Sequence, residues 1–448
     1  MNRLLIAGTN SGCGKTTVTC ALLAALQARG ITTTAFKCGP DYIDPMFHRA
    51  ISGVTAYNLD PFFWDGEGLR SHLASHAGEM SVMEGAMGYY DGIAATHESS
   101  AYTVARETLT PVILVISARG AASSLGAVIE GFARHRPDSR IMGVVFNGAS
   151  EARYPDLERI AADAGIRAYG TMPRKEQWEL PSRHLGLLTA AEIAGLQDMI
   201  SELGAQAART VDIDGLLALG KTAPALPVVS KPAHPRNRRI CLAIAQDEAF
   251  CFHYAENREL LEALGCDLAF FSPLRDPILP QNAKGLYLCG GYPELYAKKL
   301  SGNPTMLESI RRAVEGGLPT IAECGGFLYL HERLDGMPMC GVIGGEAYET
   351  KHLQRFGYIT LTAGRDNLLC KAGDSIRAHE FHYWDSASPG DSFTARKAGR
   401  EASYPCVHAT GSLYAGFPHL YFPANPALAE RFVEKMIRYE IRTRRLTC

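Results

Sequence analysis

Residues 4–17 read LLIAGTNSGCGKTT, an apolar run followed by a glycine-rich turn and the sequence Lys-Thr-Thr. Leu4 to Ala7 has the apolar continuity of a strand that is buried on both faces. Thr17 to Arg29 then places apolar side chains at helical spacing, and Gly30 is a typical helix stop. A strand that enters a helix through such a turn directs backbone N–H groups toward one point. The stretch therefore predicts a polyphosphate site at the start of an α/β sheet.

The glycine-rich turn carries the residue types that bind nucleotide phosphates. A lysine at this position can reach the β- and γ-phosphates of ATP, and the hydroxyl of the next threonine can bind Mg²⁺. Thr9 stands where the strict P-loop pattern has a glycine, and a glycine-rich turn without a ligand is the alternative interpretation. The expected ATP-binding residues are Gly12, Gly14, Lys15, Thr16 and Thr17.

Strands and helices alternate through the first half, which favours a doubly wound parallel sheet covered by helices. The further expected strands are Thr32 to Lys37, Ser81 to Glu84, Val112 to Ser117 and Met142 to Phe146. Because the carboxyl ends of parallel strands converge on one crevice, we expect the acidic residues that follow them near the phosphates and Mg²⁺. The alternative is that the Asp-Pro and Asp-Gly pairs only form turns. These acidic residues are Asp41, Asp44, Glu84 and Asp91.

A proline-rich break separates two α/β halves. Residues 220–239, GKTAPALPVVSKPAHPRNRR, contain four prolines and few large apolar side chains, which is typical of an exposed linker. We therefore expect an ATP-binding domain over 1–220, a linker over 221–238 and a second α/β domain over 239–448. In the second domain the expected strands are Ile240 to Ala245, Leu268 to Phe271, Gly285 to Cys289 and Thr320 to Glu323, with helices at Ala255 to Leu264 and Met306 to Glu315.

Composition excludes several classes of partner. The formal net charge of the 448 residues is -2, so no strong basic field attracts nucleic acid or anionic lipid. No apolar run is long enough to cross a bilayer, and the N-terminal residues lack the features of a signal peptide. The 12 cysteines lack zinc-knuckle spacing and are typical of reduced, buried thiols. We expect a cytoplasmic protein that binds neither nucleic acid nor membrane.

One cysteine stands apart from the others. Residues 321–330, IAECGGFLYL, predict a strand, a tight turn at Cys324 and the start of a helix, which resembles a nucleophile elbow. A helix N-terminus and an adjacent histidine would both favour the thiolate of Cys324. The backbone N–H groups of Gly325 and of Gly291, in the GGYPE segment after another strand, could stabilise an oxyanion.

The histidine partner of Cys324 must come from elsewhere in the sequence. His419, in FPHLYF, is our choice, and His379 and His382, in AHEFHY, are rivals. The latter two are three residues apart rather than four, so they lack the helical zinc spacing. A structural role is the alternative for each of the three histidines.

Taken together, these segments resemble the cobyrinate a,c-diamide synthases, a family that amidates cobalamin precursors and related tetrapyrroles. The resemblance covers nearly the whole chain. The N-terminal half also resembles dethiobiotin synthetase, and the C-terminal half resembles the flavodoxin-like class I glutamine amidotransferase domains. The motifs, all in family order, are AGTNSGCGKTT, FKCGPDYIDPMFH, NLDPFFW, EGAMGYYDG, DEAFCFHYAEN, FSPLRDP, GGYPELY, AECGGFLYL and HEFHYW.

The resemblance implies roles for residues that match these motifs. Cys324 would be the nucleophile on glutamine and His419 its activating base. Tyr421 stands where class I amidotransferases usually have glutamate, which fits a version of the site with only a cysteine–histidine dyad. Lys15 and Thr16 would contact ATP–Mg²⁺. The residues implied around the metal and the activated carboxylate are Glu84, Asp41, Tyr42, Asp44 and Asp91, with Glu84 and Asp41 as metal ligands beside Thr16.

Base recognition departs from the family pattern. Asn147 resembles the adenine-reading asparagine of the relatives, but Gly148 follows it where arginine is usual. The resemblance implies that ATP phosphorylates the a and c acetate groups of cobyrinic acid and that ammonia from L-glutamine displaces the phosphate. Nickel-sirohydrochlorin a,c-diamide synthase, with another macrocycle, is the alternative within the class. A partitioning-type P-loop ATPase and a stand-alone cysteine hydrolase are rivals from other classes. The sequence leaves open whether the chain is a monomer or a homodimer.

Overall fold

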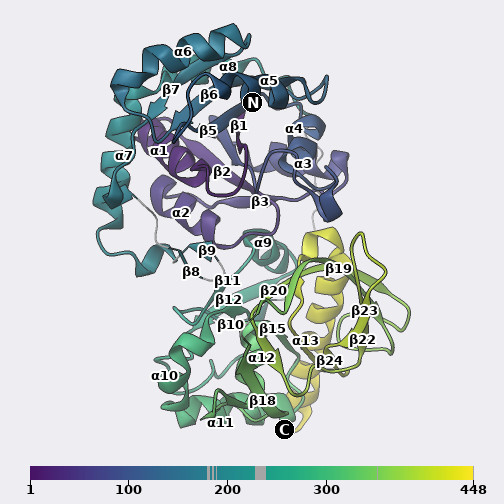
Figure 1. Ribbon diagram of the computed structural model, residues 1–448. Helices are drawn as coiled ribbons and strands as arrows, with labels where there is room; N and C mark the ends of the chain where they lie inside the picture. Colours follow the sequence, from purple (N-terminus) through teal and green to yellow (C-terminus); the bar gives the residue numbers. More distant parts are fainter. Residues whose placement is uncertain (179–181, 184–185, 188, 228–238, 351, 447–448) are drawn as a thin grey trace. The chain divides into compact units, whose positions relative to one another are not determined.

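The protein is described by a computed structural model that covers residues 1–178, 182–183, 186–187, 189–227, 239–350 and 352–446. The chain divides into two compact units, Met1–Ser230 and Lys231–Cys448 (Figure 1). The predicted linker over 221–238 begins where the last helix of the first unit ends at Lys221, and its residues 228–238 lie outside the described residues. Within the described residues, every helix is too short or too polar to span a membrane.

The first unit is built on a seven-stranded sheet in the order β3-β2-β4-β1-β5-β6-β7, and all neighbouring strands run parallel. This confirms the predicted parallel sheet. The strands β3 and β7 were not predicted from the sequence. The bounds are β1 Asn2–Gly8, β2 Thr33–Cys38, β3 Tyr57–Leu59, β4 Met80–Glu84, β5 Val112–Ser117, β6 Ile141–Asn147 and β7 Arg167–Met172.

Helices cover both faces of this sheet, because its central strands carry apolar side chains on both faces. Figure 1 shows α1, α2 and α7 on one side of the sheet and α3 and α4 on the other. The helices are α1 Lys15–Ala28, α2 Ile43–Ser52, α3 Gly66–His76, α4 Ala101–Glu107, α5 Ser124–Arg134, α6 Tyr154–Asp163, α7 Leu196–Thr210 and α8 Ile213–Lys221. Strand β8 Ser182–Arg183 pairs antiparallel with β9 Gly186–Leu187.

The second unit contains a six-stranded sheet in the order β12-β10-β13-β15-β25-β24, parallel except for the last pair. Its strands are β10 Ile240–Ala245, β12 Cys266–Phe271, β13 Gly285–Leu288, β15 Thr320–Glu323, β24 His408–Ala409 and β25 Leu413–Gly416. Its helices are α9 Ala255–Ala263, α10 Ala297–Ser301, α11 Pro304–Glu315, α12 Gly325–Leu330 and α13 Pro426–Leu446. The alternation of strands and helices up to α12 confirms the expected α/β class.

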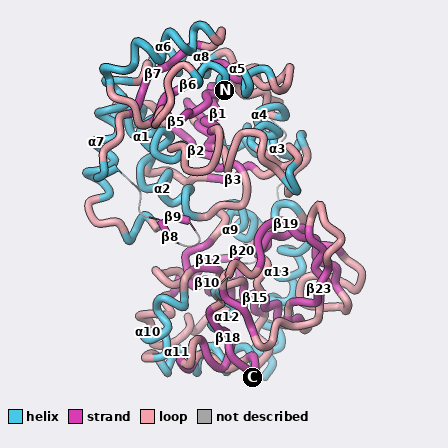
Figure 2. The backbone as a smooth tube through the Cα atoms, in the orientation of Figure 1, coloured by secondary structure: helices cyan, strands magenta, loops and turns pink. Residues whose placement is uncertain are grey.

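Between α12 and β24 the chain changes character, because strands follow one another without α-helices (Figure 2). A four-stranded sheet has the order β17-β16-β18-β21, and a five-stranded antiparallel sheet has the order β23-β22-β19-β20-β26. The sequence did not predict this layer. Its strands are β16 His331–Leu334, β17 Met337–Pro338, β18 Ile343–Glu349, β19 Arg355–Ala363, β20 Ser375–His382, β21 Trp384–Ser386, β22 Phe393–Lys397, β23 Ser403–Cys406 and β26 His419–Leu420. A small ladder also pairs β11 Phe250–Phe252 with β14 Gly290–Gly291.

Candidate functional site

The turn between β1 and α1 has the backbone of a phosphate-binding loop. Gly12 and Gly14 adopt left-handed φ angles of 79° and 99°, which favour glycine. Helix α1 begins at Lys15, whose ammonium group donates to the carbonyl oxygen of Asn10 at 3.0 Å. The Lys15 side chain thus lies back over the turn, where a phosphate would meet it.

Asn147, at the end of β6, supports the same turn. Its amide nitrogen donates to the carbonyl oxygen of Cys13 at 3.0 Å. A Cβ atom added to Gly14 would lie 1.9 Å from that amide nitrogen, so the close approach requires glycine. The structure therefore shows Asn147 holding the loop, while its role in reading adenine stays a prediction.

Thr16, on α1, and Glu84, at the end of β4, are joined by a hydrogen bond. The Thr16 hydroxyl donates to Glu84 Oε1 at 2.6 Å, and the other carboxylate oxygen of Glu84 lies 2.8 Å from His48 Nε2. Glu84 and His48 are both fully buried. A buried charge is costly unless it is paired, so the partners of Glu84 decide its state.

Lys37, on β2, is the main partner of the buried carboxylates. Its ammonium group donates to Asp44 in a short contact and to Glu84 Oε1 at 3.0 Å, and Asp41 lies 4.0 Å away. Burial lowers the pKa of Lys37, but attraction to Asp44 and Glu84 outweighs it and raises the pKa well above its ordinary value. Burial is also the largest single effect on Glu84 and raises its pKa, but the attraction of Lys37 and the contacts with His48 and Thr16 together outweigh burial and lower the pKa well below its ordinary value. The pair is therefore ionised.

Sequence reasoning missed Lys37 and His48. Lys37 follows Ala35 and Phe36 in the expected strand and is 3% exposed, so a lysine within a strand expected to be buried could have identified the first of them. His48 lies on α2, and its position beside Glu84 depends on how that helix packs, which the sequence does not state.

The other predicted acidic residues are arranged differently. Asp41 Oδ1 accepts hydrogen bonds from the backbone N–H groups of Ile43 and Asp44, so this carboxylate also caps α2. Tyr42 is the residue that precedes α2 and is buried. Asp91 accepts from the N–H of Gly88 at 2.9 Å within its own turn, as the alternative interpretation expected. The roles of these residues toward a substrate stay predictions.

The donor set suits a hard cation that is held mainly by phosphates and water. The Thr16 hydroxyl and the Glu84 and Asp44 carboxylates lie together around Lys37. Mg²⁺ commonly takes only one or two protein oxygens beside nucleotide phosphates. Among the residues that the structure describes, no group of three or more His, Cys, Asp or Glu side chains could hold a metal alone. The residues thus fit Mg²⁺ bound together with a nucleotide.

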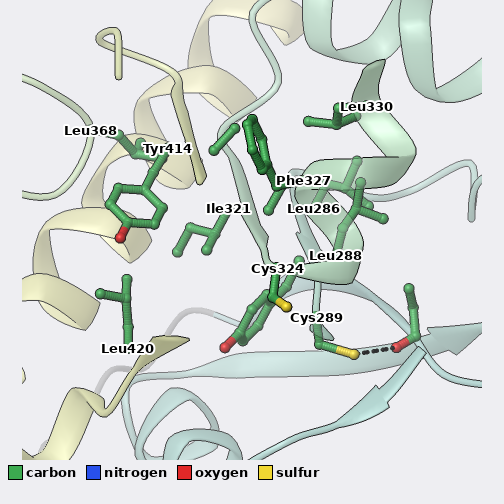
Figure 3. Packing of buried hydrophobic residues seen from close by; sticks show 14 of the residues in the cluster. Leu286, Leu288, Cys289, Ile321, Cys324, Phe327, Leu330, Leu368, Tyr414 and Leu420 are labelled. Carbon is green, nitrogen blue, oxygen red and sulfur yellow. Dashed lines mark hydrogen bonds between the residues drawn. The ribbon is translucent and has the colours of Figure 1, made fainter. Parts of the chain in front are cut away.

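Cys324 occupies a strained turn at the end of β15. Its φ of 46° and ψ of -103° are rare for a residue with a side chain, and such strain is typical of a nucleophile elbow. The turn is fixed on both sides, because Cys324 N donates to Gly416 O and Cys324 O accepts from Leu328 N. Figure 3 shows the sulfur among the buried residues at the carboxyl end of this sheet, near Cys289.

Burial has the largest effect on the Cys324 thiol. Burial, and then repulsion from Glu294, raise the pKa of the thiol well above its ordinary value. The Gly325 N–H lowers the pKa, which is the direction expected of a helix N-terminus, but burial outweighs it. Helix α12 has only six residues, and Cys324 is 7% exposed, so burial is the larger effect.

The predicted oxyanion residues lie next to each other. A Cβ atom added to Gly325 would be 3.0 Å from Gly291 N and 2.8 Å from Pro293 Cδ. The two backbone segments can approach this closely only because residue 325 is glycine. The structure therefore brings Gly291 and Gly325 together, while their donation to an oxyanion stays a prediction.

His419 lies on β26, which pairs with β20. A Cβ atom added to Gly290 would be 2.6 Å from His419 Cε1, so the imidazole lies against the segment that carries Gly291. The rival His379 stacks on His419 with 4.9 Å between ring centroids, and His382 stacks on Phe417 instead. Of the three candidates, His419 contacts the Gly290–Gly291 segment.

Sequence reasoning also missed Glu323, the residue before Cys324. Its side chain is 1% exposed, and Oε2 lies 3.6 Å from His419 Nδ1. Burial raises the pKa of Glu323, and its contacts with His419 lower it in part. An acidic residue at the end of the apolar strand β15 was the available signal.

The fold and these two sites define a P-loop nucleotide-binding domain joined to a glutamine amidotransferase domain. Residues 4–188 match the family described as the CobQ/CobB/MinD/ParA nucleotide binding domain. Residues 241–427 match the CobB/CobQ-like glutamine amidotransferase domain. The fold class expected from the sequence is thereby confirmed.

Whole-chain relatives narrow this class. The cobyrinate a,c-diamide synthase of Caldanaerobacter subterraneus subsp. tengcongensis is 36% identical over 96% of this chain and 97% of its own. The cobyrinate a,c-diamide synthase of Clostridium acetobutylicum is 37% identical over 95% of this chain and 98% of its own. The hydrogenobyrinate a,c-diamide synthase of Streptomyces coelicolor is 37% identical over 97% of both chains. The chain belongs to the cobyrinate a,c-diamide synthase family, whose glutamine-dependent members form carbon–nitrogen bonds.

Proposed function

We propose that the chain is an ATP- and glutamine-dependent ligase that amidates the a and c acetate groups of cobyrinic acid in cobalamin biosynthesis. The supporting observation is that likeness to relatives of this name spans both units and includes both sites. Residues 1–220 would be the synthetase domain, 221–238 the linker and 239–448 the glutaminase domain. We place the enzyme in the cytoplasm.

The second unit supplies ammonia. Cys324 Sγ attacks the side-chain carbonyl carbon of L-glutamine while its proton passes to His419. Gly291 and Gly325 N–H groups stabilise the oxyanion, and His419 then returns the proton to the leaving nitrogen as the C–N bond breaks. Water next attacks the thioester, its proton passes through His419 to sulfur, and glutamate leaves. The raised pKa of Cys324 fits this sequence, because the thiol loses its proton during attack.

The first unit activates the acid. A carboxylate oxygen of the macrocycle attacks the γ-phosphorus of ATP, ADP leaves, and an acyl phosphate forms. Ammonia then attacks the acyl carbon and phosphate leaves, which gives the amide. Lys15 would neutralise the transferred phosphate, with Gly12, Gly14 and Thr17 cradling the rest. Thr16, Glu84 and Asp41 would hold Mg²⁺, which supplies positive charge to the phosphates when bound.

The identity of the macrocyclic acid is proposed from the names of the relatives. The Streptomyces coelicolor relative is named for hydrogenobyrinate and the others for cobyrinate, so the named acid differs among relatives with similar likeness to this chain. Nickel-sirohydrochlorin is the alternative acid, and Tyr42, Asp44 and Asp91 are the proposed neighbours of the reacting carboxylate. A partitioning ATPase would leave the strained Cys324 turn without a role.

The test compares two nitrogen sources. Purified Cys324→Ala protein should form diamide from cobyrinic acid with ammonium chloride and should fail with glutamine, while ADP release with ammonia stays within about twofold of wild type. Cys289→Ala is a matched control, since Cys289 is a buried thiol near Cys324 that contacts Ala245 O and His253 (Figure 3). Glutamine-dependent diamide formation by Cys324→Ala would refute the nucleophile assignment. If wild type forms no diamide with either nitrogen source, the assignment of cobyrinic acid as the substrate is refuted.

A further inference from the structure

The acid expected two residues after the catalytic histidine is absent from this chain, because Tyr421 stands there. The structure offers another carboxylate at the imidazole. We propose that Glu323 is a positioning residue for His419, fixing the ring and stabilising the imidazolium formed when Cys324 gives up its proton. This inference rests on the proposed Cys324–His419 pair and adds a third member to it.

The contact has the polarity that a cysteine–histidine site requires. Glu323 Oε2 lies 3.6 Å from His419 Nδ1, which leaves Nε2 as the nitrogen for the thiol. Separations at this stage are often long without substrate and shorten in the reacting complex. The pair is almost fully removed from water, since the Glu323 and His419 side chains are 1% and 3% exposed. Charge attraction is therefore stronger here than at the surface.

Glu323 is itself held in place. Its other oxygen, Oε1, accepts from the Tyr287 hydroxyl at 3.1 Å and from the backbone N–H of Leu420 at 3.3 Å. Leu420 is the residue after His419, so the carboxylate binds both the backbone of β26 and the side chain it carries. These two donors orient Oε2 toward the imidazole.

The opposite side of the imidazole is occupied by a neutral ring. His379 stacks on His419 at an interplanar angle of 24°, and burial keeps the pKa of His379 well below its ordinary value. Glu323 therefore places a carboxyl group against His419. A carboxylate at this position would orient the ring and attract the positive charge that forms on it when Cys324 releases its proton.

Position in the chain strengthens the argument. Glu323 precedes the nucleophile on β15, and the same backbone bond from Cys324 N to Gly416 O fixes the segment that leads to His419. One strand end thus carries both the nucleophile and the acid. The alternative is a purely structural role, in which Glu323 only satisfies Leu420 N and Tyr287.

The experiment measures glutamate release and ammonia-driven ADP release by the same full-length preparations with cobyrinic acid and ATP. In Glu323→Gln we expect kcat for glutamine hydrolysis to fall about 100-fold, within the range of general acid–base effects, with KM for glutamine within about threefold. Ammonia-driven ADP release should stay within about twofold. Glu323→Asp, which keeps the charge, should recover at least tenfold of the loss.

Glu440→Gln is the matched control, because Glu440 is another buried carboxylate of this unit and its partner is Arg444 on the same helix rather than His419. Its kcat should stay within about threefold of wild type. If Glu323→Gln does not fold, Glu323→Asp carries the test, because the shorter side chain keeps the charge but moves it away from His419. Its kcat for glutamine hydrolysis should fall by about three- to tenfold with KM for glutamine within about threefold, and a kcat equal to that of wild type would overturn the proposal.

The outcomes separate this inference from the site it rests on. Loss of glutaminase in Cys324→Ala and His419→Ala, with full kcat in Glu323→Gln, overturns only the role of Glu323. Equal loss in the Gln and Asp variants, or a rise in KM at constant kcat, also overturns it and indicates a structural part. Retention of glutaminase in Cys324→Ala overturns the site itself.

Discussion

Acidification from pH 7 to pH 5 is predicted to destabilise the second unit through its buried histidines. His331 is fully buried, with its ring nitrogens 2.9 Å from Phe327 O and 2.7 Å from Ser386 Oγ. Burial lowers the pKa of His331 to about 4 and that of His382 to about 3. The folded unit therefore keeps both rings neutral at pH 5, while the unfolded chain takes up protons below about pH 6.5.

The sign and size of the change in the free energy of unfolding follow from proton linkage. Where the unfolded state binds more protons, the free energy of unfolding falls as pH falls, so the loss begins near pH 6.5 and for His331 ends near pH 4. Between pH 7 and pH 5 each histidine costs about 1.9 kcal/mol, at 1.36 kcal/mol per pH unit. Burial raises the pKa of Glu323 and Glu380, and these carboxyl groups act in the opposite direction.

A double difference isolates one histidine from the rest. Urea unfolding is followed by the fluorescence of Trp384 in a Trp64→Phe/Trp178→Phe background, because Trp384 is the tryptophan of the second unit. His331→Gln, which keeps a donor and an acceptor, should lose about 2 kcal/mol less than its parent between pH 7 and pH 5. The same loss in both proteins would refute the assignment of a neutral, buried His331.

Three further outcomes are expected. Lys15→Ala should abolish ADP release while leaving the melting temperature within about 2 °C, because the ammonium group lies over the loop rather than in a core; continued ATP use would exclude this loop. Glu84→Gln should raise the Mg²⁺ concentration for half-maximal ADP release by about tenfold, and unchanged Mg²⁺ dependence would count against its ligand role. Gly326→Ala should cost about 3 kcal/mol of stability, because the new Cβ would lie 2.1 Å from Leu288 O, whereas Gly344→Ala, with open space, should cost less than about 1 kcal/mol.

The parallel cores were predictable because their strands are mostly apolar. Val112–Ser117, Ile240–Ala245 and Thr320–Glu323 have the bounds expected from composition alone. Tyr57–Leu59 was missed, since three residues give no periodic signal. Helix α11 begins at Pro304, earlier than expected, because Asn303 accepts from Met306 N and proline suits a first helical position.

The antiparallel layer was missed for a different reason. Its strand β20 does alternate at first, with Ile376 and Ala378 buried between exposed residues, so a period-two signal was present. The register that sets His379 opposite His419 joins segments far apart in the sequence, and local patterns do not specify such pairs. The motif around Cys324 predicted the elbow, but its burial and the resulting pKa depend on this layer.

Three charged residues lie at or near the carboxyl end of a buried strand: Lys37, Glu84 and Glu323. The sequence predicted a role for Glu84 and missed the other two. Lys37 and Glu84 neutralise each other before any ligand binds. Glu323 contacts no permanent cation among the described residues, and in the proposed mechanism its partner His419 would gain charge when Cys324 releases a proton. The carboxylates of the first site thus face a cation that is already present, whereas Glu323 of the second site faces a group that would become a cation only in the proposed reaction. In the proposed mechanism, a buried cysteine with a raised pKa can therefore serve as the nucleophile, because Glu323 stabilises the charge that forms on His419.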